Sequence, residues 1–150
     1  KEQEALTQTM FAMVEDLAYL VYEIGRIQTK AKEVITMGGK PAKQAQKTWD
    51  ALEALRTDLV VTTGDNYVAS AEPELRERMG ELYSNIATSY DRVDGSLKSN
   101  FELISEEFTT EKNRFVKIMD KEVKKFYKTL KNNELALPVV KTKEVFLAKD

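Results

Sequence analysis

The chain has 150 residues, 42% hydrophobic and 32% charged, with a formal net charge of -2 and no cysteine or histidine. This composition is typical of one globular domain, and it differs from that of a disordered chain or a basic nucleic-acid-binding domain. Without histidine and cysteine, the chain cannot form a Ser-His-Asp triad, a thiolate nucleophile or the usual haem, zinc and di-iron sites. We therefore expect no catalytic residue, no cofactor and no metal site.

The clearest pattern is an apolar seam near the N-terminus. Its spacing of alternating fours and threes predicts a helix over residues 2–35 that packs lengthwise on partner helices. Gly38, Gly39 and Pro41 follow, a combination that ends one helix and begins another. The seam consists of Leu6, Met10, Met13, Leu17, Leu20, Ile24, Ile27, Ala31 and Val34.

Two further helices are predicted before residue 90. The second covers residues 41–62, and its buried stripe is Ala42, Ala45, Trp49, Leu52, Leu55 and Leu59. Residues 62–72 predict a loop, because Gly64, Asp65 and Asn66 are turn-forming residues. The third helix begins near Pro73, and its stripe is Leu75, Met79, Leu82 and Ile86.

The sequence after residue 95 allows two interpretations. Thr109, Thr110 and Glu111 resemble a helix cap and first turn, which favours two helices. One continuous helix over residues 96–131 is the alternative. Residues 134–150 predict an extended tail that packs on the bundle or trails from it. The apolar positions are Leu97, Phe101, Ile104, Phe108, Phe115, Met119, Val123, Phe126 and Leu130. The predicted fold is thus an all-α, antiparallel four-helix bundle over residues 1–133, with five helices as the alternative count.

Two sets of residues are candidates for partner binding. Tyr90, Arg92 and Asp94 lie at an expected element junction, where binding groups are common, although they also suit helix capping. The second set is a lysine stripe opposite the last apolar stripe. It is either the solvated face of an amphipathic helix or a docking surface for an acidic partner. The stripe consists of Lys117, Lys121, Lys124, Lys128 and Lys131. A carboxylate cluster at Glu102, Glu106 and Glu107 is interpreted as a solvated face.

From residue 89 onward, short motifs resemble a known family. SYDRVDGSLKSN at residues 89–100 is followed by Thr109-Thr110-Glu111 and by a helix ending in LKNN at residues 130–133. This order is similar to the C-terminal helical region of large bacterial sortilin-like proteins with BNR-repeat β-propellers, often labelled glycosyl hydrolase or exo-sialidase. Asp91 and Thr109 stand where that family usually has proline. The resemblance implies an accessory bundle in the periplasm or outside the cell, with any active site in upstream domains.

The residues together predict a non-catalytic helical interaction domain of a larger protein. It would pack on neighbouring domains or on a protein partner, and a homodimer is a further expectation. Nucleic acid is not an expected partner. No apolar run reaches the ~20 residues that a transmembrane helix needs, and we expect no signal peptide within the chain. The alternative is a periplasmic sensor-type bundle that holds a small ligand between helices, with Trp49, Tyr83, Tyr90 and Arg92 as its lining.

Overall fold

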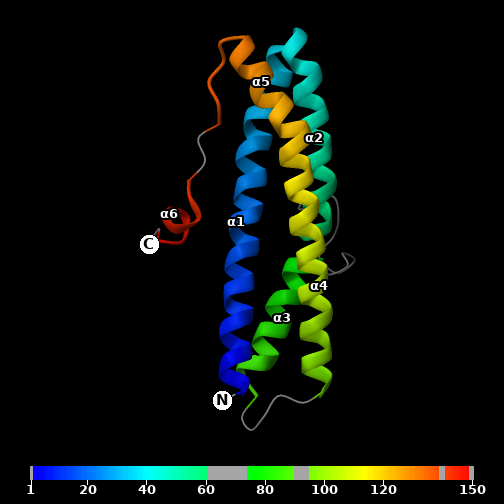
Figure 1. The fold of residues 1–150 in the computed structure, drawn as a ribbon, viewed down its shortest axis with the longest axis vertical. Coiled ribbons are helices and arrows are strands. Elements are labelled where there is room, and N and C mark those ends of the chain that lie inside the picture. The colour runs from blue at the N-terminus through cyan, green and yellow to red at the C-terminus, as the bar shows by residue number, and fades with distance from the viewer. Residues whose placement is uncertain (1, 61–73, 90–94, 139–140, 149–150) are drawn as a thin grey trace. The chain divides into compact units, whose positions relative to one another are not determined.

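The computed structural model describes residues 2–60, 74–89, 95–138 and 141–148. Figure 1 labels the α-helices α1 to α6 of these described residues. A π-helical turn, η2, joins α4 to α5. The described residues contain no strand, and their four long helices (α4, η2 and α5 counted as one rod) pack with other helices, so the predicted all-α fold is confirmed. The elements are α1 (Glu2–Met37), α2 (Lys40–Leu59), α3 (Leu75–Ala87), α4 (Gly95–Ile118), η2 (Met119–Val123), α5 (Lys124–Asn132) and α6 (Lys143–Leu147).

The chain divides into two compact units. The first unit comprises Lys1–Ala18 and Thr57–Glu111, and the second comprises Tyr19–Arg56 and Lys112–Asp150. The first unit therefore contains the beginning of α1, all of α3 and most of α4. The second contains the remainder of α1, most of α2, η2, α5 and α6. The predicted boundary at residue 133 stays a prediction.

The core of the first unit is apolar and comes chiefly from α1, α3 and α4. All four side chains of the predicted third stripe are buried, and Gln3 reaches the end of α3. There the Gln3 side-chain amide donates to the carbonyls of Ile86 (3.2 Å) and Ala87 (3.0 Å), which satisfies acceptors that a helix end leaves open. The buried residues include Met10, Leu17, Leu75, Met79, Leu82, Ile86, Ile104 and Phe108.

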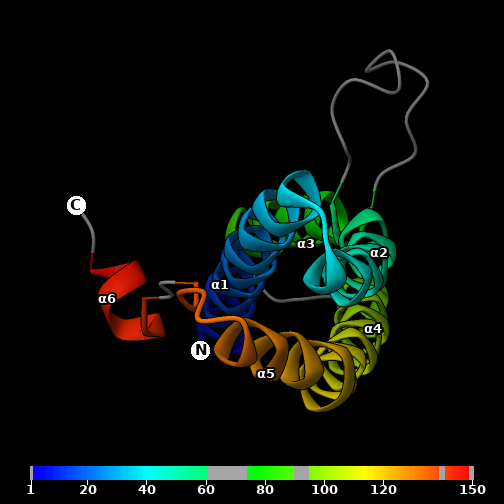
Figure 2. The same cartoon turned by 90° about the horizontal axis from the view of Figure 1, so that it is seen from above.

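The core of the second unit continues the predicted seam of α1. Gly38 and Gly39 both have positive φ, 76° and 80°, and they turn the chain from α1 into α2 as predicted. Figure 2 views the helices from above, with α1, α2 and α5 of this unit surrounding a common centre. The buried apolar residues of this unit include Leu20, Ile24, Ile27, Ala31, Val34, Ala45, Leu52, Leu55, Val123, Phe126 and Leu130.

The helix after residue 95 is continuous through Thr109 and Thr110, so the predicted helix start at these residues is wrong. Both threonines are exposed within α4, and Phe108 and Phe115 on either side are buried. Burial of large apolar side chains is worth about 2 kcal/mol each, whereas a threonine cap is worth about 1 kcal/mol. Burial along the apolar seam therefore outweighs a helix cap at Thr109. This favours the alternative of a single helix over residues 96–131.

The π-turn η2 lies where the apolar pattern shifts by one residue. Val123 follows Phe115 at i + 8, whereas Phe115 follows Phe108, and Leu130 follows Val123, at i + 7. In a regular α-helix, one extra residue rotates the following side chains by about 100°. A π-turn accommodates that residue with i→i+5 bonding, and the Lys124 N–H accordingly reaches the Met119 carbonyl. Val123, Phe126 and Leu130 are consequently buried.

The C-terminal tail is not extended throughout, and that prediction is wrong for residues 143–147, which form α6. Thr142 is the N-cap, and its hydroxyl accepts a hydrogen bond from the Val145 N–H at 3.3 Å. Glu144 in the first turn adds a favourable charge at the positive end of the helix. Local capping thus contributes to a short helix in a segment without an apolar seam.

The end of α5 provides a test of backbone strain. Glu134 has φ 56°, and the next N–H, that of Leu135, donates to the Leu130 carbonyl at 2.8 Å. A left-handed non-glycine residue costs about 1 kcal/mol. We predict that Glu134→Gly raises the free energy of unfolding by about that amount, measured by urea denaturation. The control Asn133→Gly should lower it, because Asn133 has φ -107° and its side chain bonds the Thr129 carbonyl. A destabilised Glu134→Gly variant would contradict the prediction.

Candidate functional site

Helix α2 holds the π-turn through one backbone carbonyl. The Thr48 hydroxyl, fully buried, donates to the carbonyl of Glu122 at 3.1 Å. The side-chain amide of Gln44, one turn earlier on α2, donates to the same oxygen at 3.2 Å. A carbonyl oxygen has two lone pairs, so one acceptor satisfies both donors. These two bonds fix the position of η2, and hence of the helix that follows it.

An open groove lies along η2 and α5. It has a volume of about 640 Å³, within the ~300–1,000 Å³ of ligand-binding clefts. Val123 in its wall is buried and Met119 and Tyr127 are half-buried, whereas all the lysines beside them are exposed. We call this the lysine groove, and its lining residues are Met119, Val123, Lys124, Lys125, Tyr127, Lys128 and Lys131.

The structure divides the predicted lysine stripe. Lys124 and Lys128 line the groove, whereas Lys117 and Lys121 are exposed outside its lining. Lys125, which the stripe omits, joins the lining. Within the described ranges, none of these lysines forms an ion pair. Their charges therefore face solvent around an apolar surface.

A half-buried carboxylate, that of Glu23, lies near Tyr127 of the groove. Burial raises the pKa of Glu23 on α1 above its ordinary value. The pKa of Tyr127 is also raised, first by burial and then by the negative charge of Glu23. Both effects favour the phenol form of Tyr127, whose ring lines the groove. Tyr127 thus offers a neutral, partly apolar surface beside the lysines.

The tail is attached to α1 by two tyrosines one turn apart. The Tyr19 hydroxyl donates to the Lys141 carbonyl at 2.6 Å, and the Lys141 N–H donates to the Tyr22 hydroxyl at 3.1 Å. Phe146 of α6 packs against both rings, with centroid distances of 5.7 and 4.9 Å. The Arg26 guanidinium lies 5.9 Å from the Tyr22 ring. These contacts engage the backbone N–H and C=O of Lys141 and the ring of Phe146, and they hold the tail against α1.

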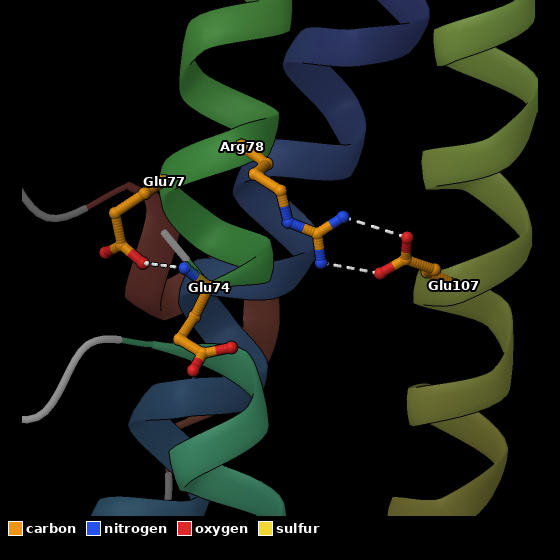
Figure 3. A network of polar contacts seen from close by, with 4 residues as sticks. All are labelled: Glu74, Glu77, Arg78 and Glu107. Carbon is orange, nitrogen blue, oxygen red and sulfur yellow. Dashed lines mark hydrogen bonds and ion pairs between the residues drawn. The ribbon is translucent and has the colours of Figure 1, made fainter. Parts of the chain in front are cut away.

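In the first unit, α3 and α4 are joined by an ion pair. Figure 3 shows the Arg78 guanidinium facing the Glu107 carboxylate, with two hydrogen bonds of 2.9 and 2.6 Å. The hydrogen bond to Arg78 lowers the pKa of Glu107 below its ordinary value, although desolvation acts in the opposite direction. In the same view, the Glu74 N–H at the start of α3 donates to the Glu77 carboxylate.

The carboxylate cluster on α4 is divided between an ion pair and exposed positions. Glu107 pairs with Arg78, and Glu102 and Glu106 are exposed on one helix. Among the described residues, no group of three acidic or metal-ligating side chains could hold an ion. None of the helices in those ranges combines the length and apolarity needed to cross a bilayer.

The other candidates from the sequence are Tyr90, Arg92, Asp94, Trp49 and Tyr83. Tyr90, Arg92 and Asp94 lie outside the described residues. Trp49 is half-buried on α2, and its backbone carbonyl accepts a 3.3 Å bond from Gln28. Tyr83 packs against the Phe11 ring at 6.1 Å.

Sequence reasoning missed the polar residues that position the groove and the tail. Gln44 and Thr48 look like ordinary helix residues, although their i, i + 4 spacing on the inner side of α2 was a signal. Tyr19 and Tyr22 lie beside the seam. Their role depends on contact with Phe146, which is more than 100 residues away in the sequence. The shift of the apolar pattern at Met119 was the other visible signal.

Comparison with known proteins gives no relative: no family model, no curated protein and no solved structure matches this chain.

The hydrogen bond from Thr48 to the π-turn predicts that loss of this hydroxyl lowers the free energy of unfolding. Thr48→Val keeps the volume but leaves the Glu122 carbonyl with one donor fewer, so we expect a loss of about 1–2 kcal/mol in the free energy of unfolding. The control is Thr36→Val, which removes an exposed hydroxyl bonded to the Lys32 carbonyl of its own helix and should change little. Equal effects of the two variants on urea denaturation would refute the role of Thr48.

The Arg78–Glu107 pair predicts a pH dependence. Because the folded-state pKa of Glu107 is lowered, its stabilisation is complete above the unfolded value of about 4.5 and is lost as pH falls through the folded value. Both side chains are more than one third exposed, so solvent screening limits the effect to about 1 kcal/mol or less. The stability difference between wild type and Glu107→Gln, measured by urea denaturation, should vanish in acid. A difference that persists unchanged in acid would contradict the prediction.

Proposed function

We propose that this chain is a non-catalytic helical interaction domain that docks an acidic protein surface on the lysine groove. The observation that carries the proposal is the arrangement of the groove: exposed lysines surround half-buried Met119 and Tyr127. Protein interfaces have this organisation, with an apolar centre and a polar, charged border.

The position of the groove supports docking rather than a merely solvated helix face. The π-turn and the bonds from Thr48 and Gln44 fix α5, so the groove is formed before a partner binds. A preformed surface avoids part of the ordering cost of association. Unpaired lysines in turn attract an acidic partner through a field that salt screens.

The resemblance to the helical region of propeller-containing bacterial proteins supplies a context for this proposal. In that context, the acidic surface would belong to a neighbouring domain or to a protein in the periplasm or outside the cell. A sensor-type bundle with a small ligand is the other candidate. It would show itself as thermal stabilisation by a sugar or a small anion in the absence of any protein partner.

A charge-reversal experiment tests the proposal. The probe is fluorescein-labelled poly-L-glutamate, and binding is followed by fluorescence anisotropy at low and high salt. We expect Lys124→Glu/Lys128→Glu to weaken binding about tenfold or more, where each tenfold corresponds to about 1.4 kcal/mol. Added salt should weaken binding to the wild type.

The matched control is Lys43→Glu/Lys47→Glu, which makes the same charge change at exposed positions on α2 of the same unit. It should retain most of the affinity. Equal losses in both double variants would mean that net charge, rather than the groove, attracts the probe, and that result would refute the proposal.

A further inference from the structure

We propose that the lysine groove receives the acidic face of α4 from a second copy of this chain. This inference rests on the proposed function, because it names the partner of the same groove. We define the acidic face as Glu102, Leu103 and Glu106, three exposed residues on α4. The contact is therefore heterologous: one copy contributes the groove and the other contributes the acidic face.

The acidic face carries the negative charges that the lysine groove lacks. Glu102 and Glu106 are exposed carboxylates one helical turn apart, and Leu103 beside them is 56% exposed. An open hollow of about 340 Å³ lies next to them, lined by Leu103, Glu106, Glu107, Thr110 and Glu111. A large apolar side chain beside two carboxylates is suited to a surface where apolar residues lie beside lysines.

The two surfaces also match in spacing. Glu102 and Glu106 are four residues apart on one helix, as are Lys124 and Lys128 on another. A rise of about 1.5 Å per residue gives both pairs the same separation, about 6 Å. Two helices packed side by side can therefore form both ion pairs at once, as in the flanking positions of coiled coils. Leu103 then faces the apolar part of the groove.

Another exposed apolar segment of the chain suits the groove less well. In α6, Val145 is 55% exposed beside Glu144. However, Lys141 and Lys143 lie immediately before Glu144, and their charges would oppose those of the groove. Phe146 of that segment already packs on α1. Charge complementarity thus favours α4 over α6.

The arrangement has a consequence for assembly. The acidic face and the groove belong to the contiguous helix from α4 to α5, so the contact requires two copies. After a single contact, one copy still has a free acidic face and the other still has a free groove. A pair in which each copy binds the other would occupy both surfaces of both copies. Exposed ion pairs are individually weak, so we expect association at high protein concentration and low salt.

The test uses two full-length variants in sedimentation velocity. Glu102→Gln/Glu106→Gln removes the charges of the acidic face, and Lys124→Gln/Lys128→Gln removes those of the groove border. We expect the wild type to self-associate reversibly at low salt and each variant alone to remain monomeric. An equimolar mixture should form a 1:1 complex, because one variant supplies an intact groove and the other an intact acidic face. Circular dichroism confirms that both variants fold.

The outcomes separate this inference from the proposed function. If the wild type stays monomeric while poly-L-glutamate still binds the groove, the second-copy partner is refuted and the docking function stands. If the variants self-associate as the wild type does, or if their mixture does not associate, the proposed contact is wrong. If poly-L-glutamate binding is also insensitive to Lys124→Glu/Lys128→Glu, the docking function fails as well. Lys43→Gln/Lys47→Gln serves as the control and should self-associate as the wild type does.

Discussion

The contact between Thr48 and the Glu122 carbonyl is the constraint on which the second unit depends. It is a polar contact made by a fully buried side chain. A buried polar group without a partner costs about 1–3 kcal/mol, so the position of this carbonyl is tightly restricted once α2 is packed. Gln44 adds a second donor to the same oxygen. The π-turn is thus stabilised by side chains of a different helix, and not by its own sequence alone.

This constraint decides which residues of α5 face the core and which face solvent. Without the π-turn, the extra residue between Phe115 and Val123 would rotate α5 by about 100°. Phe126 and Leu130, now buried, would move toward solvent, and lysines would move toward the core. Burial of an unpaired lysine is far costlier than the local distortion of one turn. The same turn that completes the core therefore places Lys124 and Lys128 on the surface.

The apolar pattern of the sequence predicted the long helices before residue 90 and most of the core, but it did not predict α6 or the polar contacts. The seam from Met10 to Val34 and the stripe from Leu75 to Ile86 depend only on local periodicity, which one sequence contains in full. The cap at Thr109 was wrong because local hydrogen-bonding preference is weak beside continuous burial. The Tyr22–Lys141 contact could not be predicted, because it joins residues more than 100 positions apart that share no pattern.

In an isolated molecule, the apolar residues of the lysine groove and the charges of its lysines have opposing effects. Its apolar residues favour contact with the aliphatic stems of the lysines, whereas the ammonium groups repel one another and favour separation in water. Lys124, Lys125 and Lys128 lie within two turns of one helix and find no ion pair within the described ranges. Carboxylates brought to this border relieve the repulsion, and an apolar side chain beside them covers part of the apolar surface. The repulsion lowers the stability of the free chain slightly, but the same charges favour an acidic partner, and α4 contains carboxylates at the matching spacing.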